Sequence, residues 1–380
     1  MPFRSDKFYM FPLFSKPKKT IYTAAVVGLG RIGYSLGQDK KREQPASHTA
    51  ALLANPRIKM IAGCDTDISR AEEWHTANYP LPAYMNTANL FARHKPDIVT
   101  VAVNEDNHLK VSLDAINAKP KLVILEKPVA LNTKDALIIK AEAEKNGVPI
   151  LVNHERRFAE DYALARDYMH KIGEIQSINA LLSSSLKVYD KAEESTGSYS
   201  LIHDGTHLVD IVMFLLEGIL PAKTDSEPES HSGLLSRAQK SRYKPILHNP
   251  VVSGIFRDDS GAVRNVTALY ETSVCPCVTV SLSGRSKYFG FDIDIRGTLG
   301  RICIGNGYFS VYKSAPSTLY TGFKSLTIDN SAKAPPQTLY FSNMVQNAVD
   351  FLDGKTELKS TLKTGIDALC VLEEIKAALM

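Results

Sequence analysis

The fold of this chain is decided by one short stretch, residues 22–33, which read YTAAVVGLGRIG. Its first half is an unbroken apolar run, typical of a buried parallel strand, and its second half carries three spaced glycines. Glycines at these steps permit a tight turn, close approach of the backbone to a pyrophosphate, and close packing of the next helix. We therefore predict that phosphates face a helix N-terminus at Gly28, Gly30, Arg31, Ile32 and Gly33.

An acidic residue follows the next predicted strand, Lys59–Cys64. Asp65 stands where dinucleotide-binding folds place a carboxylate on the adenosine ribose. It lies 37 positions after Gly28, whereas about 20 are usual, so we expect an insertion around residues 38–46 to loop out. A carboxylate here would repel a 2′-phosphate. The sequence thus favours NAD over NADP, and Arg70 is the one residue that could reverse this choice.

The order of elements divides the chain into two domains. From residue 21 to 152, short apolar strands alternate with helices, which predicts a Rossmann α/β domain with a parallel sheet. From residue 153 to 380, helices and a run of turn-separated strands predict an α+β domain with an open, mainly antiparallel sheet, for substrate binding and oligomerisation. Residues 1–20, aromatic and basic, are expected to form an N-terminal arm, and residues 225–250 an interior loop.

Apolar periodicity and turn residues set the expected bounds of the elements. The strands expected in the first domain are Tyr22–Val27, Lys59–Cys64, Ile98–Val103, Leu122–Leu125 and Ile150–Val152. Its helices include one from near Ser47, Leu109–Ala118 and Lys134–Lys145, the last with Thr133 as N-cap. The second domain is expected to contain helices Glu160–Lys171, His203–Leu216, Thr338–Asp353 and Thr361–Leu379, with strands between Ile175 and Tyr312.

Charge and hydropathy exclude two classes of partner. The chain has 45 basic and 41 acidic residues, a net charge of +4, and the two signs are interspersed, so nucleic acid is not an expected partner. No apolar run approaches the roughly 20 residues that a membrane helix needs. We expect a cytoplasmic protein that binds no membrane.

Polar residues follow two more predicted strands at the carboxyl edge of the sheet, where such sheets bind ligands. Asn104 and His108 come after the strand that begins at Ile98, and Glu126-Lys127-Pro128 follows the strand that ends at Leu125. A lysine at this edge can donate or accept a proton if its surroundings lower its pKa. Taken alone, each of these residues is also typical of a surface loop.

Two further polar segments lie in the second half. The first is Asn153–Phe158, which contains Arg156, and the second is HDGTHLVD, residues 203–210. On a continuous helix His203, His207 and Asp210 would share one face. Two histidines four residues apart also invite a zinc site, but Asp204 replaces the glutamate of the hydrolytic motif and no third ligand is apparent. We predict no metal.

Taken in this order, the glycine turn, the acid after the second strand, Asn104 with His108, the Glu-Lys-Pro and the HDGTHLVD segment resemble the Gfo/Idh/MocA family of oxidoreductases. The resemblance implies that Lys127 lies beside nicotinamide and substrate and that His207 is the catalytic histidine. It also implies that Asn104, His108 and Glu126 adjoin the cofactor, and that Arg156, His203, Asp204 and His207 face the substrate. The family's aspartate four residues before His207 is here His203. Either His203 takes over its role or Asp204 swings in.

The function that this resemblance implies is NAD(P)-dependent hydride transfer to or from a secondary alcohol carbon of a sugar, sugar acid or cyclitol. Two alternatives stay open, an NAD-assisted glycoside-cleaving enzyme and a non-catalytic NAD-sensing regulatory protein. The intact Lys127 and His207 argue against the sensor, which has no use for a proton relay. The open sheet of the second domain favours a homodimer or homotetramer formed through that face.

Overall fold

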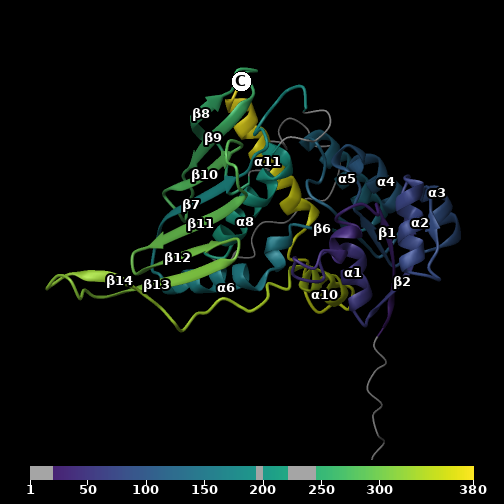
Figure 1. Cartoon of the computed structure of the whole chain (residues 1–380), viewed down its shortest axis with the longest axis horizontal. Helices are drawn as coiled ribbons and strands as arrows, with labels where there is room; N and C mark the ends of the chain where they lie inside the picture. Colours follow the sequence, from purple (N-terminus) through teal and green to yellow (C-terminus); the bar gives the residue numbers. More distant parts are fainter. Residues whose placement is uncertain (1–19, 194–199, 221–244) are drawn as a thin grey trace, which may run out of the picture.

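The computed structural model describes residues 20–193, 200–220 and 245–380. Within these ranges it contains a six-stranded parallel sheet and an eight-stranded, mainly antiparallel sheet, side by side with helices between them (Figure 1). The predicted fold class is therefore confirmed. Nearly all of the predicted N-terminal arm, and most of the loop predicted at residues 225–250, lie outside the described residues.

The first sheet has the strand order β3-β2-β1-β4-β5-β6. Its strands are β1 (Tyr22–Val27), β2 (Ile58–Cys64), β3 (Ala83–Tyr84), β4 (Ile98–Val101), β5 (Leu122–Leu125) and β6 (Ile150–Val152). Sequence patterning found all of these except β3, whose two residues are too short to show a period. The order reverses direction between β1 and β4, so the carboxyl ends around this point form the ligand edge of such a sheet.

Helices cover both faces of this sheet. They are α1 (His48–Ala54), α2 (Ile68–Ala77), α3 (Thr87–Arg93), α4 (His108–Asn117) and α5 (Thr133–Asn146). The N-cap predicted for α5 was wrong by one residue, because the side chain of Asn132 accepts from the amide of Asp135. Thr133 instead donates its hydroxyl to Glu373 of the last helix, α11 (Leu362–Ala378), and so links α5 to α11.

The helix that follows the glycine turn is built from two separate pieces of chain. One helical turn forms directly after the glycines, where the amide of Tyr34 donates to the carbonyl of Gly30 at 2.9 Å. Residues 35–47 then loop away from this turn, and the chain comes back to it at α1. The amide of His48, the first residue of α1, donates to the carbonyl of Ile32 at 3.0 Å. The insertion inferred from the spacing thus loops out of a helix that stays continuous in its hydrogen bonds.

The insertion is attached at its far side to the C-terminal half of the chain. The carboxylate of Glu43 accepts hydrogen bonds from the amide of Thr338 at 2.8 Å, from its hydroxyl at 3.0 Å and from the amide of Leu339 at 2.5 Å. Leu339 has φ +54° and immediately precedes helix α10 (Tyr340–Leu352). Glu43 therefore satisfies amides at a helix start that has no side-chain cap of its own.

The second sheet has the order β14-β13-β12-β11-β7-β10-β9-β8, antiparallel except for the parallel pair β7 and β10. Its strands are β7 (Ile175–Ser183), β8 (Val251–Arg257), β9 (Val263–Tyr270), β10 (Val278–Ser283), β11 (Gly290–Gly297), β12 (Gly300–Gly305), β13 (Tyr308–Pro316) and β14 (Lys324–Ile328). The sequence did not predict β14. Helices α6 (Glu160–Tyr168), α8 (Gly205–Glu217) and α11 lie on one face, and no helix of the described ranges covers the other face, which is called the bare face below (Figure 1).

Helix α10 returns from the second sheet to the first. Its Phe341 and Met344 are buried together with Leu52 of α1 and Trp74 of α2, under β1 (Figure 1). One face of the first sheet is therefore partly covered by a helix that lies far beyond residue 152 in the sequence. The domain boundary predicted at residue 152 stays a prediction. None of the helices in the described ranges has both the length and the apolar character that crossing a membrane requires.

Replacing Glu43 with alanine is expected to destabilise the chain by about 2 kcal/mol, because two backbone amides at the start of α10 lose a charged acceptor. Urea unfolding at pH 7 measures the change. Glu72→Ala, an exposed glutamate of α2, is the matched control and should unfold near the wild-type midpoint. Equal midpoints for the two variants would contradict a role for Glu43 in holding this junction.

Candidate active site

Chemistry-bearing residues gather at the carboxyl edge of the first sheet. Gly28 follows β1, Asp65 follows β2, Asn104 lies beyond β4, Glu126 follows β5 and Asn153 follows β6. Parallel neighbours in the order β2-β1-β4-β5-β6 bring these positions to one edge although they span about 125 residues of sequence. The sequence predicted this gathering correctly.

The glycine turn has the shape that a dinucleotide needs. At Gly28, where φ is +96°, a Cβ atom would lie 2.4 Å from the carbonyl oxygen of Ala102, and at Gly33 it would lie 1.9 Å from the carbonyl oxygen of Gly28. At Gly30 a Cβ would meet only the flexible guanidinium of Arg70, at 3.6 Å. Two glycines are thus required by packing, and the third leaves its side of the turn open to a pyrophosphate.

Asp65 lies against this turn, as expected for the acid that follows the second strand. Its buried carboxylate accepts from the amide of Leu29 at 2.7 Å and from the amide of Asp67 at 2.9 Å. Arg70, half-exposed, pairs with Asp67 at 3.6 Å while its guanidinium lies near Gly30. The carboxylate predicted to meet the ribose and the cation that could reverse the cofactor choice are therefore both next to the glycine turn.

Glu126 is buried at this edge of the sheet, and its expected contact with the cofactor stays a prediction. Its buried carboxylate accepts from Nε2 of His48 at 2.7 Å, from Nδ2 of Asn153 at 2.6 Å and from the amide of Lys127 at 3.2 Å. Burial raises the pKa of this carboxyl, but the hydrogen bonds from His48 and Asn153 and the charge of Lys127 lower it to about 2. Glu126 is thus a buried anion that holds the backbone of Lys127.

His48 is a residue of this site that sequence reasoning missed. It is buried in α1, the helix that resumes after the insertion, and its Nδ1 is without a hydrogen-bond partner in the described ranges. Its position in the sequence gives no signal, because the insertion separates it from the glycines by fifteen or more residues. The signal that could have found it is the buried glutamate, which requires a partner.

Of the two residues predicted after β4, His108 supports the Lys127 turn. His108 is buried, with Nδ1 2.6 Å from the carbonyl oxygen of Pro128 and Nε2 3.1 Å from that of Val103. The Lys127–Pro128 peptide bond is cis. Asn104 is exposed on the loop that follows β4. His108 therefore fixes the turn from the side opposite Glu126.

The helix expected to begin at His203 is broken there, which corrects the predicted convergence of three polar residues. The short helix α7 (Ser200–His203) ends at His203, and α8 starts at Gly205. Asp210 is buried and pairs with Nε of Arg157 at 2.9 Å, so it belongs to the core and not to a face shared with His203. The early stop at His203 follows from Gly205, which weakens a helix that would run through it.

Lys127 lies near both histidines of this segment. Its Nζ donates to the carbonyl oxygen of His203 at 3.1 Å. Desolvation lowers the pKa of His207 most, and the nearby charges of Lys127 and Arg156 lower it further, so this pKa is well below the ordinary value. Nδ1 of His207 has no partner among the described residues. The imidazole of His207 is therefore neutral at physiological pH.

The two arginines of Asn153–Phe158 have different roles. Arg157 is fully buried between Asp210 and Glu217, and these carboxylates raise its pKa despite burial. Arg156 stacks its guanidinium 3.9 Å from the ring centroid of Phe291 and donates to Glu155 at 3.1 Å. Arg156 is the member of the pair whose charge reaches His207, and its predicted contact with substrate stays a prediction.

A second residue that the sequence analysis missed is Glu105, directly after Asn104. Its carboxylate forms a short hydrogen bond with Nδ1 of His203, across the gap between the loop after β4 and α7. Burial raises the pKa of Glu105, but the hydrogen bond and charge of His203 and the charge of Lys127 bring it below the usual value. The two histidines of the HDGTHLVD segment do not meet a third metal ligand in the part of the chain that the structure describes. Among the described residues, no group of three or more His, Cys, Asp or Glu side chains is arranged to hold a metal ion.

Comparison with known proteins agrees with this geometry. Residues 22–154 match the model of the Gfo/Idh/MocA family, described as an oxidoreductase family with an NAD-binding Rossmann fold. This match confirms the resemblance noted in the sequence. A curated relative from Comamonas testosteroni, 1-carboxy-3-chloro-3,4-dihydroxycyclohexa-1,5-diene dehydrogenase, is 22% identical over 226 residues, which cover 57% of this chain. The match spans about half of that relative, 52% of its length.

Solved structures share the fold over almost the whole chain. A dehydrogenase from Chromobacterium violaceum superposes with a TM-score of 0.72 at 16% identity, covering 94% of this chain and 95% of that one. An oxidoreductase from Agrobacterium radiobacter, solved with NAD⁺, L-tartaric acid and magnesium, gives a TM-score of 0.68 at 17% identity, covering 95% and 96%. Both the parallel sheet and the open sheet of this chain are therefore parts of one known architecture.

Substituting Glu126 with glutamine tests the buried anion. The folded-state pKa of about 2 lies below the value of about 4.3 for an unfolded chain. Ionised Glu126 therefore contributes stability, about 3 kcal/mol, that is complete above the unfolded value and is lost as the pH falls towards 2. The difference in unfolding free energy between wild type and E126Q, from urea titrations, should shrink between pH 6 and pH 3. A constant difference, or the same behaviour in the exposed control E72Q, would contradict this account.

Proposed function

We propose that this chain, whose residues 22–154 form the NAD-binding domain of a Gfo/Idh/MocA oxidoreductase, is a dehydrogenase acting on a secondary alcohol of a polyhydroxylated small molecule. The observation that carries the proposal is the position of Lys127. Its backbone is fixed by Glu126 and by the contact of His108 with Pro128. Its amine donates to the carbonyl of His203 and is close enough to His207 to lower the pKa of that imidazole. A fixed amine beside two imidazoles is suited to proton exchange at a hydroxyl.

The glycine turn and Asp65 would hold the cofactor. When bound, nicotinamide accepts or supplies the hydride, and the protein orients it. We propose NAD in preference to NADP, because the buried Asp65 carboxylate lies where the adenosine ribose is bound in this fold and would repel a 2′-phosphate. Arg70 does not cancel this charge, since its partner is the neighbouring Asp67.

Two side chains bear on the substrate oxygen. Nζ of Lys127 polarises the oxygen and stabilises the charge that develops on it as the hydride leaves. An imidazole, of His203 or His207, exchanges the hydroxyl proton. For the substrate we propose a sugar, sugar acid or cyclitol. The Agrobacterium structure was solved with a polyhydroxylated acid, and the Comamonas relative is named for a ring with two hydroxyl groups, which supports this class.

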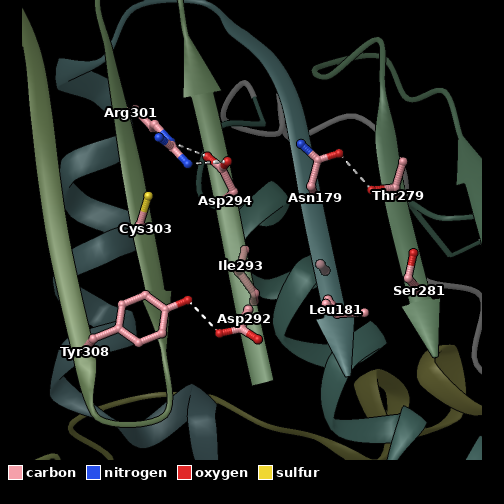
Figure 2. Close-up of a pocket in the computed structure, with 11 residues that line it drawn as sticks. Asn179, Leu181, Thr279, Ser281, Asp292, Ile293, Asp294, Arg301, Cys303 and Tyr308 are labelled. Carbon is pink, nitrogen blue, oxygen red and sulfur yellow. Dashed lines mark hydrogen bonds and ion pairs between the residues drawn. The ribbon is translucent and has the colours of Figure 1, made fainter. Parts of the chain in front are cut away.

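The bare face of the second sheet is proposed as a self-association surface. A hollow of about 430 Å³ lies on this face. Figure 2 shows paired polar side chains that line it, such as Arg301 with Asp294 and Tyr308 with Asp292. None of the predicted site residues lines it. Beyond β13 the hairpin to β14 projects from the body (Figure 1), with Leu319 and Phe323 exposed to 78% and 69%. Apolar side chains this exposed favour burial against a second copy of the chain.

A panel of sugars, sugar acids and inositols, followed by NADH or NADPH absorbance, tests the activity. We expect turnover of at least one member of the panel with NAD⁺, with a lower kcat/KM for NADP⁺. Lys127→Met should lower kcat by about 10² or more, because the charge opposite the developing alkoxide is gone. Lys110→Met, on the exposed side of α4, is the control. Full activity of K127M would remove this lysine from the reaction.

Light scattering after gel filtration tests the association surface. The wild-type chain should elute as a dimer or tetramer, and the double variant Leu319→Ser with Phe323→Ser should shift towards the monomer mass of 41.9 kDa. Ile68→Ser, an exposed apolar residue of α2, provides a control that should leave the mass unchanged. A wild-type monomer, or a variant with wild-type mass, would contradict the proposed role of the hairpin.

A further inference from the structure

We propose that Glu105 and His203 form a carboxylate–imidazole pair in which Nε2 of His203 takes the substrate's hydroxyl proton and Glu105 acts as its positioning residue. The proposal rests on the dehydrogenase function proposed above and names the base of that reaction. It follows from a departure in this chain. A histidine occupies position 203, where the family pattern has an aspartate, and a carboxylate reaches it from a different segment.

The geometry defines the tautomer of His203. The carboxylate of Glu105 lies against Nδ1, and its pKa is below the usual value despite burial, so Glu105 is an anion that accepts the proton of Nδ1. With Nδ1 protonated, a neutral imidazole carries its lone pair on Nε2. Oδ1 of Asp204 lies 3.9 Å from Nε2, beyond hydrogen-bond distance. Nε2 is therefore available as a base.

The position of His203 connects the reacting lysine with solvent. Its carbonyl oxygen accepts from Nζ of Lys127 at 3.1 Å, and Glu105, which contacts its ring, is close enough to feel the charge of the same amine. Its side chain is 42% exposed, whereas that of Glu105 is 15% exposed. A proton taken up on Nε2 can thus pass to water without crossing the core, and the anion that supports it stays shielded.

His207 is the less suitable acceptor of the two. It is half-buried, and desolvation together with the charges of Lys127 and Arg156 lowers its pKa well below the ordinary value, so a positive charge on its ring is disfavoured. His203 also lies near Lys127, but it has the anion of Glu105 in direct contact and Asp204 nearby. Of the two rings, only that of His203 has a carboxylate in hydrogen-bond contact among the described residues, so it is the ring that we assign as the base.

The proton step balances as follows. The hydroxyl O–H bond of the substrate breaks, its proton moves to Nε2 of His203, and the oxygen keeps the electron pair. As the carbonyl double bond forms from that pair, the carbon's hydride leaves for the nicotinamide ring. Glu105 keeps its hydrogen bond to Nδ1–H throughout and is not protonated. Water then takes the proton from Nε2, and the imidazole is restored.

Steady-state kinetics with the full chain separate this pair from its neighbours. Glu105→Ala and His203→Ala should each lower kcat by about 10² or more, with KM for NAD⁺ within threefold of wild type. Asp106→Ala, the exposed acid next to Glu105, is the control with wild-type rates. Added imidazole should restore part of the activity of H203A, because the site of the missing ring is open to solvent. His207→Gln should lose less of kcat than H203A.

A measurement that needs no turnover examines the same pair. In protein labelled with ¹⁵N-histidine, the ring signals absent from His203→Gln are assigned to residue 203. Wild type should show the Nδ1–H tautomer there, and E105A should lose it. Full kcat in H203A, a wild-type Nε2–H tautomer, or abolition of activity by H207Q alone would each overturn the proposal. If the wild-type chain turns over nothing in the panel, the dehydrogenase assignment fails, and the ¹⁵N spectrum still decides whether the pair exists.

Discussion

The site depends on one buried charge, the carboxylate of Glu126. A carboxylate removed from water is stable only with hydrogen-bond donors on its oxygens, and here the donors come from α1, from the end of β6 and from the backbone of Lys127. These partners fix three segments relative to one another. Because the third of them is the backbone amide of Lys127, the requirement to satisfy a buried anion also holds the backbone of the lysine proposed to react.

Residues with a local signal could be predicted from the sequence. The glycine turn, Asp65 and the Glu-Lys-Pro follow apolar strands, and the ends of parallel strands must share an edge, so their meeting follows from topology. The fold class followed in the same way from the change in periodicity near residue 153. Even the insertion was correctly placed, because a spacing that is too long has to be accommodated as a loop.

Contacts between distant segments could not be predicted. His48, Glu105 and the pairing of Arg157 with Asp210 depend on which helices pack together, and no sequence period encodes that choice. The same limit explains the error at Asp210. Helical spacing puts Asp210 on the face of His203, but the helix is interrupted at residue 204. The buried Arg157 pairs with the carboxylate of Asp210. Burial decided the role of each of these residues, and burial is a property of the tertiary structure.

The helix made from two pieces has a consequence for how this chain can vary. A backbone hydrogen bond joins Ile32 directly to His48, across the loop of residues 35–47. The glycine turn and the buried imidazole of His48 therefore tolerate a loop of any length whose two ends lie at the same positions. Relatives with shorter or longer detours can keep the same chemistry. By the same reasoning, new chain termini introduced within residues 39–42 by circular permutation leave every backbone bond of that helix intact.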